Sequence, residues 1–189
     1  MNKFDHITLN TQRLLLRPLN QKDQQAILGL RSNPLVSRYT GYKNWTALAQ
    51  AAELIEKDIA AMASGDYVRF GLVRRDNESL IGTCCLFHLD RQCRRAEIGY
   101  DLHPEEWGQG FMHESLEPLL GLGYTDMGLN RIEADVDPLN LASLKTLQRL
   151  GFRQEGLLRE RWIVNGVKAD TVILGMLHAE WLARHERTG

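Results

Sequence analysis

Apolar positions along this chain switch between a spacing of two, typical of strands, and a spacing of three to four, typical of helices. Strands are expected at 11–19, 68–73, 79–89, 131–137, 153–164 and 168–176, and a further strand begins at Ala96. Helices are expected from the N-cap Asn20 to Arg31, from Ala47 to Ser64 behind a Thr46 cap, from Phe111 to Thr125, and from Leu141 to Leu150 between an Asn140 cap and a Gly151 stop. Residues 35–45 are expected to be irregular, and residues 178–187 to form a terminal helix or a tail.

This order of elements, β-α-α-β-β-β-α-β-α-β-β, predicts a mixed α/β (α+β) fold. The strand, helix and strand between 96 and 137 imply a right-handed parallel crossover, while hairpins such as the one at Asn165-Gly166 imply antiparallel neighbours. We therefore expect a mostly antiparallel sheet with one parallel pair and helices on both faces. The length of 189 residues suits one domain spanning 1–189, with 177–189 as a tail or short helix.

Composition narrows the classes of function. The formal net charge is −1 at pH 7, so no overall charge draws the chain to nucleic acid or to a membrane surface. No apolar run approaches the ~20 residues that span a bilayer, and residues 1–6 lack the apolar core of a signal peptide, so we expect a cytoplasmic protein. Cys84, Cys85 and Cys93 match no zinc-binding spacing, which predicts no metal site and structural roles for the three thiols.

Candidate chemistry concentrates between Ala96 and Met112, where a strand and a short turn lead into a helix through Gly108-Gln109-Gly110. Backbone N–H groups at a helix N-terminus, together with the helix dipole, bind anions such as phosphates. The stretch is not a P-loop, which requires G-x-x-x-x-G-K-[ST], and not a dinucleotide fingerprint, because His113 stands where the third glycine belongs. Taken alone, it indicates either an anion pocket or a tight turn.

Motifs further along the chain add to this signal. Asn140 and Ser143 open a helix that ends at Leu150-Gly151-Phe152, and Glu155-Gly156 follows. The other matching pieces are Arg13-Leu14-Leu15-Leu16-Arg17, Ala96-Glu97-Ile98-Gly99-Tyr100, Trp107-Gly108-Gln109-Gly110-Phe111 and Asp170. In this order the set resembles the GNAT family of acetyl-CoA-dependent N-acetyltransferases, and most closely its RimJ/RimL branch, which acetylates ribosomal-protein N-termini. The resemblance covers Leu9 to Leu177 and implies the GNAT fold, in which the parallel strand pair splays apart.

The resemblance implies acetyl-CoA as the cofactor, with coenzyme A as the product. The pyrophosphate would bind the loop residues Trp107, Gly108, Gln109, Gly110, Phe111 and Met112, with His113 close by. Backbone groups of Tyr100 and Leu102 would bind the pantetheine and polarise the thioester, and Asn140 and Ser143 would contact the pantetheine arm. Met112 departs from the family's phosphate loop, [RQ]-x-x-G-x-[GA], in which a small residue stands last, so we expect its side chain to point into the helix packing.

For the chemistry, the resemblance implies that Ser143 protonates the departing thiolate, since Leu147 stands where many GNAT enzymes use a tyrosine. Glu97, on the splayed strand, is the expected base that takes a proton from the amine. Some RimL-type proteins have a proposed base, a glutamate, on the sixth strand, and that position is Trp162 here. The alternatives are an ion pair of Glu97 with an arginine, a purely helical role for Ser143, a base acting through water, and no base at all.

The expected acceptor is the N-terminal α-amine of a protein, and Tyr42 and Trp45 in the aromatic segment are candidates for binding it. A polyamine, an antibiotic or an amino acid is an alternative acceptor, although the acceptor loops hold no strong acidic cluster, which disfavours polycations. A non-catalytic acyl-CoA-binding sensor is the alternative from a different class. A homodimer is in keeping with this branch of the family, and no nucleic-acid or membrane partner is expected.

Overall fold

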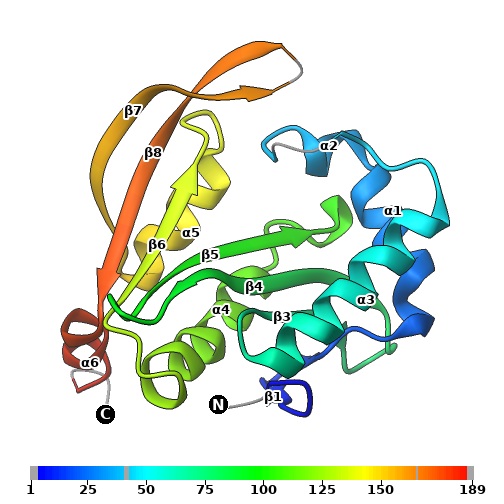
Figure 1. Cartoon of the computed structure of the whole chain (residues 1–189), viewed down its shortest axis with the longest axis horizontal. Coiled ribbons are helices and arrows are strands. Elements are labelled where there is room, and N and C mark those ends of the chain that lie inside the picture. The colour runs from blue at the N-terminus through cyan, green and yellow to red at the C-terminus, as the bar shows by residue number, and fades with distance from the viewer. Residues whose placement is uncertain (1–3, 41–42, 165, 187–189) are drawn as a thin grey trace.

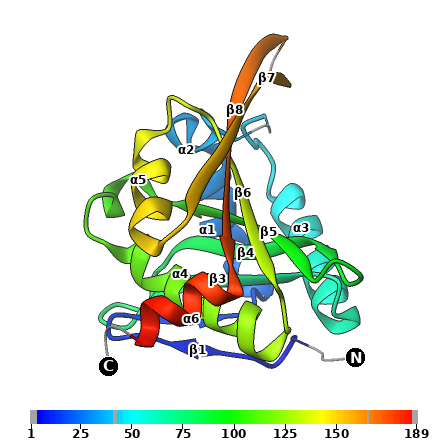
Figure 2. The ribbon, with the colours of Figure 1, turned by 90° about the vertical axis from the view of Figure 1, so that its left-hand side faces the viewer.

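The computed structural model describes residues 4–40, 43–164 and 166–186 (Figures 1 and 2). Its strands are β1 (Leu9–Asn10), β2 (Leu14–Arg17), β3 (Val68–Arg74), β4 (Leu80–Asp90), β5 (Arg95–Leu102), β6 (Arg131–Val136), β7 (Arg153–Val164) and β8 (Val167–Leu177). Its α-helices are α1 (Gln24–Ser32), α2 (Pro34–Ser37), α3 (Leu48–Ser64), α4 (Phe111–Gly121), α5 (Leu141–Leu150) and α6 (His178–Glu186). Short 3-10 turns lie at Gln21–Asp23 and Pro104–Glu106, and a π-helical turn lies at Leu122–Asp126.

The strands form one sheet in the order β1-β2-β3-β4-β5-β6-β8-β7. Every neighbouring pair is antiparallel except β5 and β6, which α4 connects as a parallel crossover. Helices lie on both faces, with α5 and α3 on opposite sides of the sheet (Figure 2). The predicted fold, a mixed and mostly antiparallel sheet with one parallel pair, is therefore confirmed.

The parallel ladder is much shorter than its two strands. Register pairs join residues 95–97 of β5 with residues 131–133 of β6, and the pairing stops there. β5 continues to Leu102 beside β4, whereas β6 continues to Val136 beside β8. The strands therefore diverge after Glu97 and Glu133, as Figure 1 shows, and leave between them an opening that we call the gap.

The two faces of the sheet differ in character at the gap, because side chains alternate along each strand. Ile98 of β5 and Ala134 of β6 are buried in the main core together with Leu116 and Leu119 of α4. On the opposite face, Asp101 of β5 forms an ion pair with Arg31 of α1. We call the face that α4 and α5 cover the helical-core side, and the face toward α1 and α2 the acceptor side.

Capping chemistry accounts for several helix boundaries. Asn20 and Asp23 form a capping box at the turn that leads into α1. The Asn140 side chain accepts a hydrogen bond from the Ser143 amide at the start of α5, and Gly151 ends that helix with a φ of 100°. These residues were predicted to start and stop the helices, and the structure confirms them.

Three details of the sequence prediction are wrong. Ala47, not Thr46, is the N-cap of α3, because the Gln50 side chain accepts hydrogen bonds from both backbone amides at that point. A short helix, α2, begins ahead of the segment expected to be irregular, because Asn33 caps it and a proline at its first position suits a helix. The helix expected to run to Thr125 changes at Leu122 into the π-helical turn.

The three cysteines differ in burial. Cys84 and Cys85 are buried in β4, but Cys93 is exposed in the turn between β4 and β5, so a packing role for this thiol is wrong. Among the described residues, no group of three or more His, Cys, Asp or Glu side chains is arranged to hold a metal ion. In the same part of the chain, no helix is both long and apolar enough to cross a membrane.

Gly82→Ala is expected to destabilise the pairing of β4 with β5. A Cβ there would lie 2.3 Å from the carbonyl oxygen of Asp101 and 3.1 Å from Cα of Leu102, and neither backbone atom can rotate away. Overpacking of this kind costs about 1–3 kcal/mol, measurable as a lower free energy of unfolding in denaturant. The matched control is Gly29→Ala in α1, where a Cβ meets nothing within 4 Å and alanine favours the helix. Equal stabilities of the two variants would contradict this packing.

Candidate active site

The loop between β5 and α4 presents backbone amides beside the gap. Gly108 and Gly110 both adopt positive φ, 74° and 83°, so each turn of the loop favours a residue without a Cβ. Gly110 is the N-cap of α4, and the amides of Phe111, Met112 and His113 in the first turn have no acceptor within the helix. Together with the helix dipole, these N–H groups form a cradle suited to an anion.

Met112 does not obstruct this cradle. Its side chain is buried, with 8% exposed, and it packs into the main core. The hydroxyl of Ser115 donates to the carbonyl oxygen of Met112 at 2.9 Å. The side chain therefore points into the helix packing, as expected, and Met112 contributes only its backbone to the loop.

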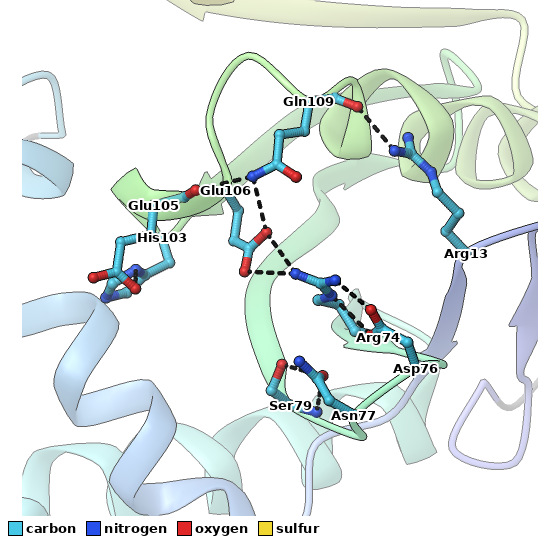
Figure 3. A network of polar contacts seen from close by, with 9 residues as sticks. All are labelled: Arg13, Arg74, Asp76, Asn77, Ser79, His103, Glu105, Glu106 and Gln109. Carbon is cyan, nitrogen blue, oxygen red and sulfur yellow. Dashed lines mark hydrogen bonds and ion pairs between the residues drawn. The ribbon is translucent and has the colours of Figure 1, made fainter.

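Two arginines from the first part of the chain hold the loop from outside (Figure 3). Arg13 donates from Nη1 to the carbonyl oxygen of Gln109 at 3.0 Å. Arg74 donates from Nη1 to both carboxylate oxygens of Glu106 at 3.2 Å, and Glu106 in turn accepts from Nε2 of Gln109 at 3.3 Å. Residues distant in sequence from the loop therefore fix its shape. We call these contacts of Arg13, Arg74, Glu106 and Gln109 the brace.

The same arginines anchor the first residue of α4. The guanidinium carbons of Arg13 and Arg74 lie 4.2 and 5.4 Å from the centroid of the Phe111 ring. Glu114 accepts from Nε of Arg13 and from the hydroxyl of Thr11, both at 2.6 Å. Burial acts to raise the pKa of Glu114, but hydrogen bonds from Thr11 and Arg13 outweigh burial and hold it below its ordinary value. The carboxylate thus stays charged as the anchor for Arg13.

The register of β4 and β5 determines which backbone groups face the gap. The amide of His103 donates to the carbonyl oxygen of Ile81 at 2.8 Å. Residues of an antiparallel pair alternate in turning their backbone groups toward the partner strand, so Tyr100 and Leu102 turn theirs away from β4 and toward β6. The carbonyl oxygen of Leu102 accepts from the Trp107 indole at 2.8 Å, which ties the loop to β5. The amides of Tyr100 and Leu102 therefore face the gap.

Tyr100 and Ser143 bring two hydroxyls together on the helical-core side of the gap. Their oxygens lie 2.7 Å apart. Burial raises the pKa of Tyr100 to about 12, opposed only in part by the hydrogen bond with Ser143, so the phenol keeps its proton across the neutral range. Leu147, at the position where many family members use a tyrosine, is fully buried. β5 thus places a phenol beside Ser143 of α5. This contact was not predicted, although alternation along β5 places Tyr100 on the same face as Ile98.

Asn140 stands at the start of α5 and lines the same space. Its Oδ1 accepts from the amide of Ser143 at 3.1 Å. Because the cap uses this oxygen, the side-chain NH2 group is the part of Asn140 left to donate to a ligand.

Glu97 lies on the acceptor side, in the last paired position of β5. Its side chain is 28% exposed, and its carboxylate contacts Nδ1 of His88 at 3.1 Å. The alternative to a catalytic role was an ion pair of Glu97 with an arginine, but in the structure its partner is His88.

Two further carboxylates share this side and were not singled out from the sequence. Asp101 pairs with Arg31 at 2.7 Å. Asp135 of β6 accepts from the Trp162 indole at 3.1 Å to each oxygen and also from the hydroxyl of Thr171. Because every second side chain of a strand lies on the same face, the positions of Glu97 on β5 and Glu133 on β6 would have predicted that Asp101 and Asp135 share this side.

Of the two aromatic candidates for acceptor binding, only Trp45 is among the described residues, and it lies apart from these carboxylates. Trp45 packs against the smaller core between α1 and α3, with its ring centroid 5.7 Å from the Arg31 guanidinium carbon, and it does not line the cavity described below. Tyr42 lies outside the described residues. Leu35, Val36 and Tyr39, from α2 and the turn that follows, form the wall on this side instead.

A cavity of about 870 Å³ joins these parts. Its lining includes the loop from Trp107 to His113 except Gln109, whose polar groups are engaged in the brace of Figure 3. Both strands along the gap contribute, and so do α2 and α5. Since lining residues come from both faces of the sheet, the cavity passes through the sheet between β5 and β6.

The sequence agrees with this geometry. A family model described as an acetyltransferase (GNAT) domain matches residues 13–153. The chain belongs to the GNAT acetyltransferases. It is accordingly an acetyl-CoA-dependent N-acetyltransferase, and the family prediction is confirmed, whereas the RimJ/RimL branch within the family stays a prediction.

Two relatives and one solved structure illustrate the likeness. An uncharacterized N-acetyltransferase of Bacillus licheniformis is 36% identical over 174 residues, which cover 92% of this chain and 98% of that protein. The spermidine N(1)-acetyltransferase of Escherichia coli K12 is 26% identical over 174 residues, which cover 92% of this chain and 91% of that protein. The structure of spermidine N-acetyltransferase from Vibrio cholerae in complex with CoA and spermine has a TM-score of 0.80 and 25% identity, over 90% of this chain and 98% of that chain.

The residues of the acetyltransferase fit its cofactor. The loop amides and the positive φ of both glycines suit a pyrophosphate, and Lys145 and Arg149 of α5 line the cavity on the same side of the sheet. The amides of Tyr100 and Leu102 and the NH2 group of Asn140 suit the polar pantetheine arm. When bound, acetyl-CoA supplies an acetyl group activated as a thioester.

Arg13→Met is expected to weaken coenzyme A binding roughly tenfold, because hydrogen bonds to charged groups contribute about 1.5–3 kcal/mol and this one shapes the loop. The turnover number at saturating acetyl-CoA should change less than twofold, since Arg13 lies outside the cavity lining. Calorimetric Kd values and steady-state kinetics measure the two effects. Arg91→Met, in the turn between β4 and β5, is the matched control and should leave both values unchanged. Equal affinities of the two variants would contradict the proposed brace.

Ser143→Ala and Tyr100→Phe are each expected to lower the turnover number, with little change in coenzyme A affinity. General acid catalysis contributes typically about 10²–10⁴-fold. Because the two hydroxyls are hydrogen-bonded to each other, the double variant should lose less than the product of the single losses. Steady-state kinetics on all three variants give this coupling. Unchanged turnover in both single variants would remove the hydroxyl pair from the mechanism.

Proposed function

We propose that this enzyme acetylates a small primary amine that reaches the cavity as a cation. The observation that carries the proposal is the acidity of the acceptor side, where Glu97, Asp101 and Asp135 line the cavity. Arg31 pairs with Asp101 but leaves this side acidic as a whole. A cleft lined by carboxylates attracts an ammonium ion and favours its charged form.

The two sides of the gap carry opposite charge. Lys145 and Arg149 line the cavity on the helical-core side, and the carboxylates line it on the acceptor side. A phosphate-bearing thioester and a cationic amine would therefore approach from opposite faces of the sheet and meet between β5 and β6. The separation keeps each substrate beside residues of complementary charge.

Similar proteins support a small amine as the acceptor. The spermidine acetyltransferase of Escherichia coli is similar over 92% of this chain. The sequence disfavoured a polycationic acceptor because the acceptor loops lack an acidic cluster. In the structure, however, carboxylates of β5 and β6 line the cavity instead. Polyamines are therefore the first acceptors to test.

Three sets of groups would divide the work of acetylation. The amides of Tyr100 and Leu102 face the gap and can donate to a developing oxyanion. The hydroxyl pair of Tyr100 and Ser143 can protonate a departing thiolate, because both groups carry a proton at neutral pH. A carboxylate of the acceptor side would take the proton that keeps an ammonium from attacking, and Glu97 is the candidate from the sequence.

The α-amine of a protein N-terminus is the second candidate acceptor. The motif resemblance between Leu9 and Leu177 supports it. A peptide would need room behind its first residue, and on this side α2 lines the cavity with Leu35 and Val36. The wall formed by α2 favours the smaller acceptor.

An acceptor panel tests the proposal through thiol release from acetyl-CoA, with products identified by mass spectrometry. The panel contains spermidine, spermine, simple monoamines, amino acids and peptides with free N-termini. We expect kcat/KM for a di- or polyamine to exceed that for any peptide by at least about tenfold. Turnover confined to peptides would establish the second candidate instead. Tight acetyl-CoA binding without turnover on any amine would establish a sensor.

A further inference from the structure

Asp135 differs from Glu97 and Asp101 in its partners. Its oxygens accept from the Trp162 indole, 3.1 Å away in each case, and from the hydroxyl of Thr171. Both donors are neutral. Within residues 4–40, 43–164 and 166–186, no cationic side chain lies within ion-pairing distance of Asp135, whereas Glu97 faces His88 and Asp101 faces Arg31. The negative charge of Asp135 is therefore held in place without being neutralised.

The position of Asp135 along β6 places it beside the gap. The last paired residues are Glu97 and Glu133, and two residues further along the diverging strands stand Gly99 on β5 and Asp135 on β6. Gly99 has no side chain, and a Cβ there would crowd Phe87 and Cys85 of β4. Because side chains alternate, the Asp135 carboxylate lies on the acceptor side, where it lines the cavity.

The carboxylate keeps capacity for another donor. A carboxylate offers about four lone-pair positions, and the Trp162 N–H is shared between both oxygens while Thr171 contacts only Oδ1. Oδ2 therefore has room for an N–H of a ligand. The Trp162 indole and the Thr171 hydroxyl fix the orientation of the carboxylate without occupying this free position on Oδ2.

We infer that Asp135, rather than Glu97, binds the acceptor ammonium and takes its proton, and that Trp162 and Thr171 are its positioning residues. This inference rests on the proposed amine acetylation and assigns the acceptor-binding residue within it. The ligand is a primary ammonium group. Glu97, at the closed end of the gap and in contact with His88, then contributes to the acidity of the cavity without receiving the proton.

Asp135 accepts one proton from the ammonium, which leaves a lone pair on nitrogen. That lone pair forms the N–C bond to the acetyl carbonyl carbon, and the C–S bond breaks with its electron pair on sulfur. As the amide forms, the nitrogen loses a second proton to water, and the sulfur gains one from the hydroxyl pair of Tyr100 and Ser143, which takes a proton back from water. The proton on Asp135 passes to water, so the reaction of an ammonium releases one proton overall.

Trp162 lies on β7 of this chain. It occupies the position where some RimL-type proteins have a proposed glutamate base, on the strand that counts as the sixth in those proteins. The structure gives this tryptophan a place in the same site, because its indole reaches across β8 to Asp135 on β6. The carboxylate thus comes from the strand that borders the gap, and the residue on β7 orients it. This arrangement explains how the chain retains a proton acceptor without the sixth-strand glutamate.

Asp135→Asn and Trp162→Phe test the inference against acceptors of different basicity. With a strongly basic amine, Asp135→Asn should lower kcat/KM by about 100-fold or more, and Trp162→Phe by about threefold to tenfold. With a weakly basic amine that is already neutral at the assay pH, such as trifluoroethylamine, both variants should stay within about threefold of the wild type. Calorimetric affinity for coenzyme A should be unchanged in both. A merely structural role for either residue would not depend on the basicity of the acceptor.

Two control variants complete the experiment. Glu160→Gln alters an exposed carboxylate of β7 that pairs with Lys168, and it should match the wild type. Glu97→Gln should lose less than Asp135→Asn with the basic amine, and the reverse order would overturn the inference in favour of Glu97. Equal losses of Asp135→Asn on basic and neutral amines would also overturn it. If the wild-type chain acetylates no amine of the panel, the proposed function fails and this inference with it, whereas wild-type turnover with unaffected Asp135→Asn removes the inference alone.

Discussion

The early end of pairing between β5 and β6 is the constraint on which the rest of the site depends. Three residue pairs join the two strands, and each strand then follows its antiparallel neighbour. Backbone groups that would have completed the ladder, such as the amides of Tyr100 and Leu102, are left facing the gap. Buried backbone donors need partners, so an extended polar chain such as pantetheine gains hydrogen bonds there that a continuous sheet would have used itself.

The gap also separates two kinds of chemistry by the alternation of side chains. Even-numbered positions of β5 place Tyr100 beside Ser143 on the helical-core side, where the loop amides and cationic residues suit a phosphate-bearing cofactor. Odd-numbered positions place Glu97 and Asp101 on the acceptor side. The proposed acid and the proposed base therefore lie on opposite faces of one sheet. The separation suits the reaction, because the amine that attacks the carbonyl carbon must lose protons while the thiolate that leaves it must gain one.

Local signals in the sequence were sufficient for most of the elements and for the loop. Asn140 and Gly151 cap the two ends of α5 through contacts with neighbouring residues only. Gly108 and Gly110 adopt the positive φ typical of glycine. Partners distant in sequence could not be predicted in this way. The contact of Trp162 with Asp135 depends on β8 lying between β6 and β7, and the brace by Arg13 depends on β2 lying near α4. Thr46 is not the cap for a local reason, because the Gln50 side chain accepts from the amides of Thr46 and Ala47 and the helix begins after Ala47.

A crystal structure with a bisubstrate analogue, in which a polyamine is joined through an acetyl linker to the sulfur of coenzyme A, tests the central claim most directly. We expect the pantetheine between residues 98–102 and 134–136, and the pyrophosphate on the amides of 108–113. The polyamine should lie on the acceptor side with its reacting nitrogen near the Asp135 carboxylate. An analogue whose pantetheine lies outside the gap, or whose polyamine arm lies on the helical-core side, would contradict it.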